Sequence, residues 1–215
     1  MDVLSKVLEK QVYDKLFNSV KPHICKWQFG FLIGRSTVSQ LIQVVHEYAK
    51  ALEKKQQVDV IYLDFAKAFD KVPHNKLLFK LESLGVRGNL LAWFRSYLSG
   101  RRHRVVINGK ASDYLPVTSG VPQGSVLGRP LLFLIYINDM PNCISRETSL
   151  PLFADDSKCI RVILGQDDGN ALQNDLDRLL DWTKTWGMEF NLSKCKVLRL
   201  TRKKVPFERD YYLGD

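Results

Sequence analysis

The sequence has few cysteines and no apolar run long enough to cross a membrane. Its four cysteines, Cys25, Cys143, Cys159 and Cys195, are scattered without a C-x-x-C pair. This spacing fits neither a disulfide framework nor a zinc module, so we expect a reducing, intracellular compartment, either cytoplasm or nucleus. The longest apolar run, residues 131–137, is far shorter than the roughly 20 residues of a membrane-spanning helix. No partnership with a membrane is therefore expected.

Internal repeats and low-complexity linkers are also absent, and acidic residues are outnumbered. The 215 residues include 32 Lys and Arg against 23 Asp and Glu, a net charge of +9. With 45% apolar residues, the chain is long enough for a substantial core, in one domain or two tightly joined subdomains. The positive charge favours an anionic partner such as nucleic acid, although many basic proteins are merely soluble.

Two adjacent acids, Asp155 and Asp156, follow an apolar run at residues 152–154 and precede another at residues 159–164. Runs rich in branched residues predict strands, so the acids are expected at the tip of a hairpin. Two ionised carboxylates side by side repel each other, and a bound divalent cation would remove that repulsion. A solvated turn is the commoner explanation for such a pair taken alone.

A further acid, Asp64, ends a predicted strand at residues 58–65. The strand is apolar on both faces near its end, which is typical of a central strand in a covered sheet. A carboxylate at this place is unfavourable unless it is paired or bound to a metal. The alternative is an Asp that caps the next turn, a role that suits Asp70 better.

Basic and glycine-rich segments offer further candidates. Arg35 is expected just before a helix N-terminus, a place suited to phosphate, although loop arginines are usually just solvated. The glycines of residues 118–125 would allow a ligand or a backbone to approach closely. A cluster of three arginines precedes an Asn108-Gly109 hairpin turn, and its members are Arg101, Arg102 and Arg104. It would clamp a nucleic-acid backbone, or only keep an edge strand soluble.

Strands interleaved with helix pairs predict an α+β fold, an antiparallel sheet with helices on one face. If the strand of Asp64 lies beside the hairpin, Asp64, Asp155 and Asp156 converge at one edge of the sheet. Three carboxylates suffice for two divalent ions roughly 3.5–4 Å apart, which stabilise the attacking and leaving oxygens of an in-line displacement. Phosphoryl chemistry needs little beyond such positioning and charge neutralisation.

Four motifs occur in the order seen in reverse transcriptases of non-LTR (LINE-like, jockey-type) retrotransposons. They are DFAKAFD at residues 64–70, SGVPQG at 119–124, FADD at 153–156 and NLSKC at 191–195. The segment from Gly30 to Ser36 resembles the fingers motif of that family. The resemblance covers residues 27–201, between a helical lead-in at residues 1–26 and a basic, polar tail at residues 202–215.

The resemblance implies a polymerase-type palm with partial fingers and no thumb, so that thumb and endonuclease would come from elsewhere. It implies RNA-directed DNA polymerase activity, in which a DNA primer on an RNA template attacks an incoming dNTP. Asp64, Asp155 and Asp156 would hold two Mg²⁺ ions, or Mn²⁺, with the carbonyl of Phe65 as a further ligand. A truncated copy, a catalytically inactive nucleic-acid-binding remnant and an unrelated two-metal phosphohydrolase are the alternatives.

The resemblance also assigns nucleotide contacts. Arg35 would contact the triphosphate, and Lys194 would approach the leaving pyrophosphate. Phe69 matches the family's aromatic sugar gate, which leaves no space for a 2′-hydroxyl, although a core role is the alternative. Gln123 and Gly124 would line the nascent base pair.

The sequence departs from the family at Arg129, one extra residue between Gly128 and Pro130. An insertion at the start of a buried helix requires a bulge or a register shift of about 100°. We therefore expect an irregular first turn in the helix that follows.

Overall fold

The computed structural model of the protein describes residues 3–214, apart from the side chain of Arg129. The chain forms two compact units. The first comprises Met1–Pro22 and Phe69–Tyr136, and the second comprises His23–Ala68 and Ile137–Asp215. Within residues 3–214, no helix combines the length and the apolar character that a bilayer crossing requires.

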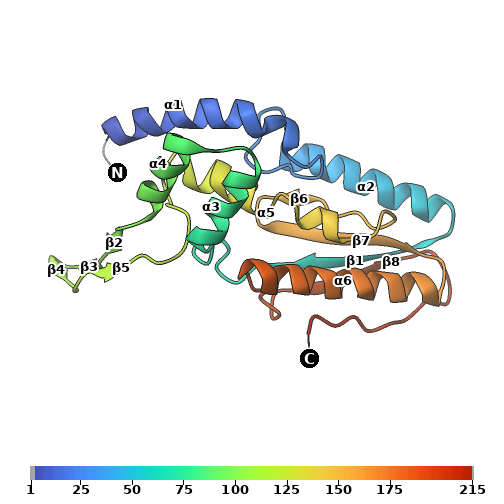
Figure 1. Ribbon diagram of the computed structural model, residues 1–215. Coiled ribbons are helices and arrows are strands. Elements are labelled where there is room, and N and C mark those ends of the chain that lie inside the picture. Colours follow the sequence, from blue (N-terminus) through green and yellow to red (C-terminus); the bar gives the residue numbers. More distant parts are fainter. Residues whose placement is uncertain (1–2, 215) are drawn as a thin grey trace. The chain divides into compact units, whose positions relative to one another are not determined.

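The second unit is built on a four-stranded antiparallel sheet with the strand order β6-β7-β1-β8 (Figure 1). Its strands are β1 (Gln57–Leu63), β6 (Leu152–Phe153), β7 (Asp156–Ile163) and β8 (Lys196–Leu200). Strand β1 pairs with β7 on one side and β8 on the other, so it lies inside the sheet, as its apolar character predicts. The α+β class and the antiparallel sheet are thus confirmed.

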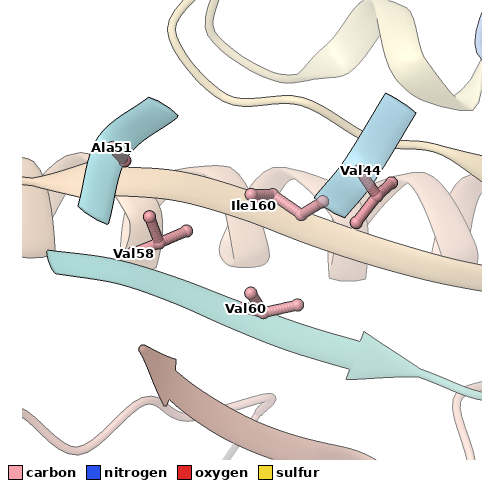
Figure 2. Packing of buried hydrophobic residues seen from close by; sticks show 5 residues of the cluster. All are labelled: Val44, Ala51, Val58, Val60 and Ile160. Atoms are coloured by element: carbon pink, nitrogen blue, oxygen red, sulfur yellow. The ribbon is translucent and has the colours of Figure 1, made fainter. Parts of the chain in front are cut away.

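Helices cover both faces of this sheet, so the prediction of helices on one face is wrong. Helix α2 (Thr37–Glu53) packs on one face, where Val44 and Ala51 contact Val58, Val60 and Ile160 (Figure 2). Helix α6 (Gln166–Trp186) lies on the other face (Figure 1). The sequence pattern missed this because an amphipathic helix reveals which of its own sides is buried, but not the face of the sheet on which it packs.

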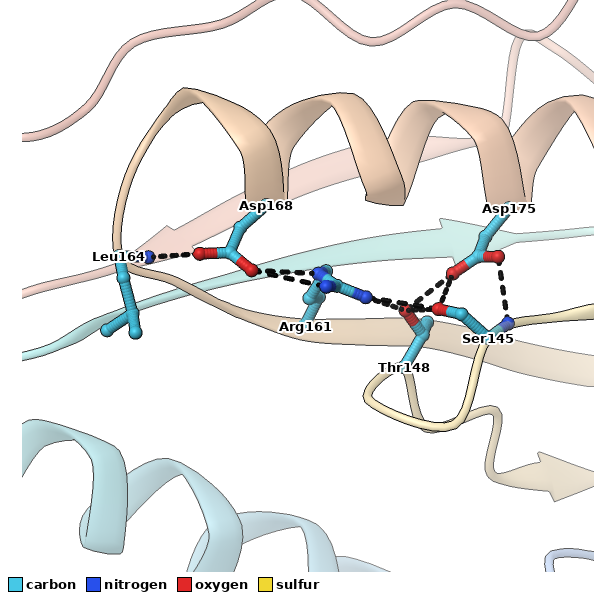
Figure 3. Close-up of polar contacts among 6 residues, drawn as sticks. All are labelled: Ser145, Thr148, Arg161, Leu164, Asp168 and Asp175. Atoms are coloured by element: carbon cyan, nitrogen blue, oxygen red, sulfur yellow. Dashed lines mark hydrogen bonds and ion pairs between the residues drawn. The ribbon is translucent and has the colours of Figure 1, made fainter.

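A buried polar network joins β7 to α6 (Figure 3). Arg161 Nη2 lies 3.1 Å from Asp168 Oδ1. Asp175 has no exposed side-chain surface, and its Oδ2 accepts hydrogen bonds of 2.6 Å from the hydroxyls of Ser145 and Thr148. Arg161 Nη1 donates to the same two hydroxyls. Because successive strand residues point to opposite faces, Arg161 in the middle of an apolar run faces α6, away from Ile160.

The first unit is mostly helical. Its regular elements are α1 (Val3–Val20), α3 (His74–Ser83), α4 (Gly88–Leu98), β2 (Arg102–His103), β3 (Val106–Ile107), β4 (Lys110–Ala111), β5 (Leu115–Pro116) and η2 (Gly128–Leu132). Short helices η1 (Lys21–His23), α5 (Phe133–Ile137) and η3 (Met140–Cys143) complete the described chain.

The extra residue at position 129 is accommodated by one wide helical turn. Gly128–Leu132 form a π-helix, in which the N–H of Leu132 donates to the carbonyl of Leu127, five residues earlier, at 3.0 Å. Such single π-turns interrupt helices at isolated places and accommodate one additional residue. Of the two predicted alternatives, a bulge or a register shift, the structure shows the bulge.

Deleting Arg129 is expected to convert this turn to regular α-helix and to raise the free energy of unfolding by about 1 kcal/mol. Urea unfolding followed by circular dichroism measures the change. Arg129→Ala is the control, because it removes the charge and keeps the insertion, so its stability should stay close to that of the native chain. A deletion that destabilises the protein would contradict this account of the turn.

Candidate active site

The structure brings Asp64 and Asp156 together at the ends of two neighbouring strands. Asp64 follows the last residue of β1, and Asp156 is the first residue of β7. Leu63 pairs with Ser157 in the last rung between these strands, so the two acids come next on the same face of the sheet. Both acids line a cavity of about 400 Å³, formed by residues of α2, β1, β6, β7 and Lys194.

Asp64 carries an oxygen that suits a cation. Its Oδ1 is shielded from solvent and accepts no hydrogen bond from any residue in the described part of the chain. Lys194 Nζ lies 3.4 Å from this oxygen and forms an ion pair with it, although the side chain of Lys194 is 63% exposed. Burying an anionic oxygen without a hydrogen bond is unfavourable. Carboxylates on adjacent strand ends around one cavity therefore fit a Mg²⁺ ion, which prefers oxygen ligands.

Asp155 occupies the turn between β6 and β7 and is half-buried. It is not among the described residues that line the cavity. Across residues 3–214, no three His, Cys, Asp or Glu side chains gather closely enough to form a metal site. The structure thus assembles two of the three expected carboxylates, because the direction of a turn residue is not fixed by the alternation of a strand.

Residues 189–191, which follow α6, pair with the backbone on both sides of Phe65, next to Asp64. The N–H of Asn191 donates to the carbonyl of Asp64 at 2.7 Å, and the N–H of Ala66 donates to the carbonyl of Glu189 at 2.8 Å. Phe65 therefore faces Phe190 across a non-hydrogen-bonded pair, and its own carbonyl points away from that neighbour. The ladder to residues 189–191 thus does not use the carbonyl that was predicted as a metal ligand.

Cys195 lies four residues further along this segment, and its N–H donates to the carbonyl of Asn191 at 3.2 Å. Burial raises the pKa of its thiol, and the negative charge of Asp64 also raises it, while a backbone hydrogen bond at Asp64 and the charge of Lys196 lower it. The net shift is upward, so the thiol stays protonated at neutral pH and is a poor nucleophile. The chemistry of the cavity rests on its carboxylates and lysines.

Arg35 contacts the loop that precedes it. Its Nη1 donates to the carbonyl oxygens of Lys26, at 2.8 Å, and of Gln28. Its guanidinium also lies 5.5 Å from the centre of the Phe29 ring. In this structure Arg35 stabilises the loop of residues 25–29 and does not line the cavity.

Gln28, in that loop, is a residue that sequence reasoning missed. Its buried amide contacts the backbone of Ala154, immediately before Asp155. The only signal in the sequence is a polar residue between Trp27 and Phe29, two residues before Gly30, and that signal does not indicate its partner.

In the first unit, the loop of residues 119–124 closes onto the segment that begins at Phe69. The N–H of Val121 donates to the carbonyl of Phe69 at 2.8 Å. A Cβ atom on Gly120 would lie 2.9 Å from the carbonyl oxygen of Asp70, so only glycine allows this approach. Phe69 is buried, and its ring centre lies 4.4 Å from that of Phe133.

Gln123 and Gly124 lie at the exposed end of this loop. Gln123 Nε2 donates to Asp70 Oδ1 at 2.8 Å, so Asp70 orients the amide. Gly124 has a φ of 77°, a left-handed conformation that favours glycine. Sequence reasoning treated Asp70 only as a turn cap and missed this contact.

The three basic residues precede an exposed hairpin. Strand β2 pairs with β5, and β3 pairs with β4 around Asn108 and Gly109, whose φ angles are 49° and 78°. Two positive φ angles define a type I′ turn, so the predicted turn is confirmed. Arg102 and Arg104 are exposed, and Arg104 lies 4.8 Å from the ring centre of Tyr114.

Comparison with known sequences identifies a family. The sequence matches the family described as "Reverse transcriptase (RNA-dependent DNA polymerase)" over residues 1–208. It is 35% identical over 210 residues to the RNA-directed DNA polymerase from mobile element jockey of Drosophila funebris. The aligned region covers 92% of this chain and 22% of that relative. It is 33% identical over 208 residues to the probable RNA-directed DNA polymerase from transposon X-element of Drosophila melanogaster. This aligned region covers 94% of this chain and 23% of that relative. The chain thus spans less than a quarter of the length of these curated relatives.

Solved structures show the same fold. Apo telomerase from Candida tropicalis, truncated from its C-terminal domain, superposes with a TM-score of 0.66 at 14% identity and covers 94% of this chain and 42% of that chain. Telomerase from the same organism in complex with a fragment of telomeric RNA gives a TM-score of 0.66 at 15% identity, over 95% and 35%. At such low identity the similarity concerns the fold alone.

Proposed function

Because the chain belongs to the reverse transcriptase family, we propose that it is an RNA-directed DNA polymerase domain of a non-LTR retrotransposon. Its reaction joins dNTPs to the 3′-hydroxyl of a DNA primer that is paired with an RNA template, inside the cell. One observation supports this most directly. Asp64 holds a buried oxygen without a hydrogen-bond donor, beside Asp156 and in the same cavity.

The carboxylates of Asp64, Asp155 and Asp156, with the carbonyl of Phe65, would hold two Mg²⁺ ions, or Mn²⁺ in their place. When bound, such ions neutralise phosphate charge and lower the pKa of the attacking hydroxyl. The hydrogen bond from Asn191 to the carbonyl of Asp64 fixes the backbone of Asp64, so the carboxylate of Asp64 is oriented before a substrate arrives. Lys194 keeps a positive charge next to Asp64, where it would meet the leaving pyrophosphate.

The family resemblance assigns the nucleotide contacts to residues of the first unit and to Arg35, which precedes α2. Gln123, oriented by Asp70, and Gly124 would line the nascent base pair. Arg35 uses Nη1 on loop carbonyls, so a contact with the triphosphate would come from its Nε or Nη2. Phe69 would lie beneath the sugar, with its ring held by Phe133.

Phe69→Val is expected to reduce the preference for dNTP over rNTP by roughly 10- to 100-fold, because the smaller side chain leaves room for a 2′-hydroxyl. Single-nucleotide incorporation with each substrate measures the ratio of the two kcat/KM values. If Phe69 is only a core residue, both rates fall together and the ratio stays constant. A constant ratio in a folded variant would therefore contradict the sugar-gate assignment.

The net charge of +9 and the exposed arginines suit a template–primer duplex. We assign Arg101, Arg102 and Arg104 to backbone contacts, because they cluster at the base of an exposed hairpin, where Arg102 and Arg104 are exposed and Arg104 lies beside the ring of Tyr114. Phosphate contacts of this kind release counterions, so their contribution depends steeply on salt.

Replacing Arg101, Arg102 and Arg104 together by Ala is expected to weaken binding of an RNA–DNA duplex about 10-fold in 0.1 M salt. The slope of log K against log salt concentration should become less negative by about 2 to 3. Fluorescence anisotropy with a labelled duplex measures both values. The matched control removes three exposed charges elsewhere, by alanine replacement of Arg202, Lys203 and Lys204. Equal losses in both triple variants would show that only net charge matters.

Primer extension on an RNA template with Mg²⁺ and dNTPs tests the proposed function. Extension of a labelled DNA primer is the expected result, in this chain or in one lengthened to match the relatives. An inactive, nucleic-acid-binding remnant is the second candidate, favoured because Asp155, unlike Asp64 and Asp156, is not among the described residues that line the cavity. Duplex binding without extension, even in the lengthened chain, would support the remnant. Hydrolysis of phosphodiesters without dNTPs would support a phosphohydrolase.

A further inference from the structure

The loop of residues 27–30 lies along the outer edge of β6. The N–H of Phe29 donates to the carbonyl of Leu152 at 2.8 Å, and the N–H of Leu152 donates to the carbonyl of Trp27 at 2.8 Å. Gln28 and Leu152 thereby form a parallel bridge. The loop thus extends the sheet next to the hairpin that carries Asp155 and Asp156.

The side chain of Gln28 connects this loop to the hairpin turn. Gln28 is only 2% exposed. Its Oε1 accepts two hydrogen bonds, from the N–H of Gly30 at 2.7 Å and from the N–H of Ala154 at 2.9 Å. Its Nε2 lies 3.5 Å from the carbonyl oxygen of Ala154. One buried amide thus contacts both backbone polar groups of the residue that precedes the two acids.

Ala154 needs such support. Its φ is 54°, a left-handed conformation that is unfavourable for every residue with a Cβ atom. It is also buried, so its N–H would lack a partner without the oxygen of Gln28. Gln28 therefore stabilises a strained backbone conformation, and this conformation sets the directions in which the next two side chains leave the turn.

Two neighbours hold Gln28 in this position. A Cβ atom on Gly30 would lie 2.3 Å from the backbone nitrogen of Ala154, so only glycine lets the loop approach this closely. Arg35 Nη1 donates to the carbonyl oxygens of Lys26 and Gln28, which fixes the loop from the other side.

We propose that Gln28 is a positioning residue for the hairpin turn, and that by holding Ala154 in the left-handed conformation it places Asp156 at the cavity beside Asp64. This inference rests on the proposed function, because it gives the orientation of Asp156 a purpose. Gln28 itself touches neither cation nor substrate. It acts through one backbone residue.

Gln28→Met tests the inference, because methionine has a similar length and volume but cannot accept the two hydrogen bonds. Loss of such an outer contact typically weakens metal affinity or activity 10- to 100-fold. We expect the Mn²⁺ affinity, measured by electron paramagnetic resonance without substrates, to fall about 10-fold. In primer extension, kcat should fall and the Mg²⁺ concentration for half-maximal rate should rise. The KM for dNTP and the affinity for the duplex should stay within about twofold.

A second substitution separates positioning from general damage. Glycine adopts a positive φ without a steric penalty, so Ala154→Gly should restore much of the Mn²⁺ affinity when it is added to Gln28→Met. Gln43→Met is the matched control, because Gln43 is exposed on α2, and it should change neither value. A folded double variant that recovers nothing would overturn the inference.

The outcomes distinguish this inference from the proposed function. If the native chain binds Mn²⁺ but neither it nor the lengthened chain extends a primer, and Gln28→Met still weakens Mn²⁺ binding, the polymerase proposal fails and the positioning role stands. If the native chain extends primers and Gln28→Met leaves Mn²⁺ affinity and Mg²⁺ dependence unchanged, the positioning role is overturned. Should Gln28→Met fail to fold, Gln28→Asn replaces it, because its amide is too short to reach both donors. Unchanged Mn²⁺ affinity in that variant would equally overturn the inference.

Discussion

Asp64→Asn is expected to reduce primer extension on the order of 10³-fold while leaving the fold intact. Asparagine has nearly the shape of aspartate, so it fills the same place at the end of β1. It cannot neutralise a divalent cation, and one of the negative charges that line the cavity is lost. Oδ1 of Asp64 is buried and accepts no hydrogen bond from the described residues, and its ion pair is with the exposed Lys194. Because exposed ion pairs contribute little, the neutral side chain should leave the free energy of unfolding nearly unchanged.

The rate of single-nucleotide addition and a urea unfolding curve, measured on the same preparation, test this prediction. Asp181→Asn is the control, because Asp181 is 74% exposed on α6 in a surface ion pair with Lys184. It should change neither measurement appreciably. Full activity in Asp64→Asn would remove this residue from the site. A loss of activity accompanied by unfolding would show a structural role.

Asp175→Ala is expected to lower the free energy of unfolding by about 3–5 kcal/mol, the largest stability effect that we predict. The carboxylate accepts hydrogen bonds from Ser145 and Thr148 (Figure 3). It also lies 3.2 Å from Arg178 Nη1. Removing it leaves two hydroxyls and the nearby charge of Arg161 buried with fewer partners, and each such loss is unfavourable.

Urea unfolding followed by tryptophan fluorescence measures this loss. Asp181→Ala on the same helix is the matched control and should cost less than about 0.5 kcal/mol, because the carboxylate that it removes is exposed. A loss below about 1 kcal/mol for Asp175→Ala would mean that the network contributes little beyond what water would supply.

The strands of the sheet were predictable because apolar alternation and turn residues act locally. Strand β1, the hairpin of β6 and β7, and the Asn108-Gly109 turn all follow from short stretches of sequence. The fully buried Asp59 in the middle of β1 did not follow. Its carboxylate accepts a hydrogen bond of 2.7 Å from Tyr211, which lies 152 residues later in the predicted polar tail. A local pattern cannot indicate so distant a partner.

The same limit applies to the site. The meeting of Asp64 and Asp156 was predictable, because a strand-end acid beside an acidic hairpin needs only one strand pairing. The contact of Gln28 with Ala154 was not, because it joins segments 126 residues apart and depends on one left-handed residue. Arg35 looked like a phosphate ligand because of its place before a helix. Its contacts with loop carbonyls became visible only in three dimensions.

The most direct test of the account is a double-mutant cycle on Mn²⁺ affinity with Asp64→Asn and Asp156→Asn. If both carboxylates bind one ion, either substitution removes most of the affinity, and the double variant binds little more weakly than each single variant. Isothermal titration of the native chain and the three variants supplies the four dissociation constants. Strong non-additivity is the predicted result. Additive losses, or native affinity in either single variant, would show that the two strand ends do not share a cation.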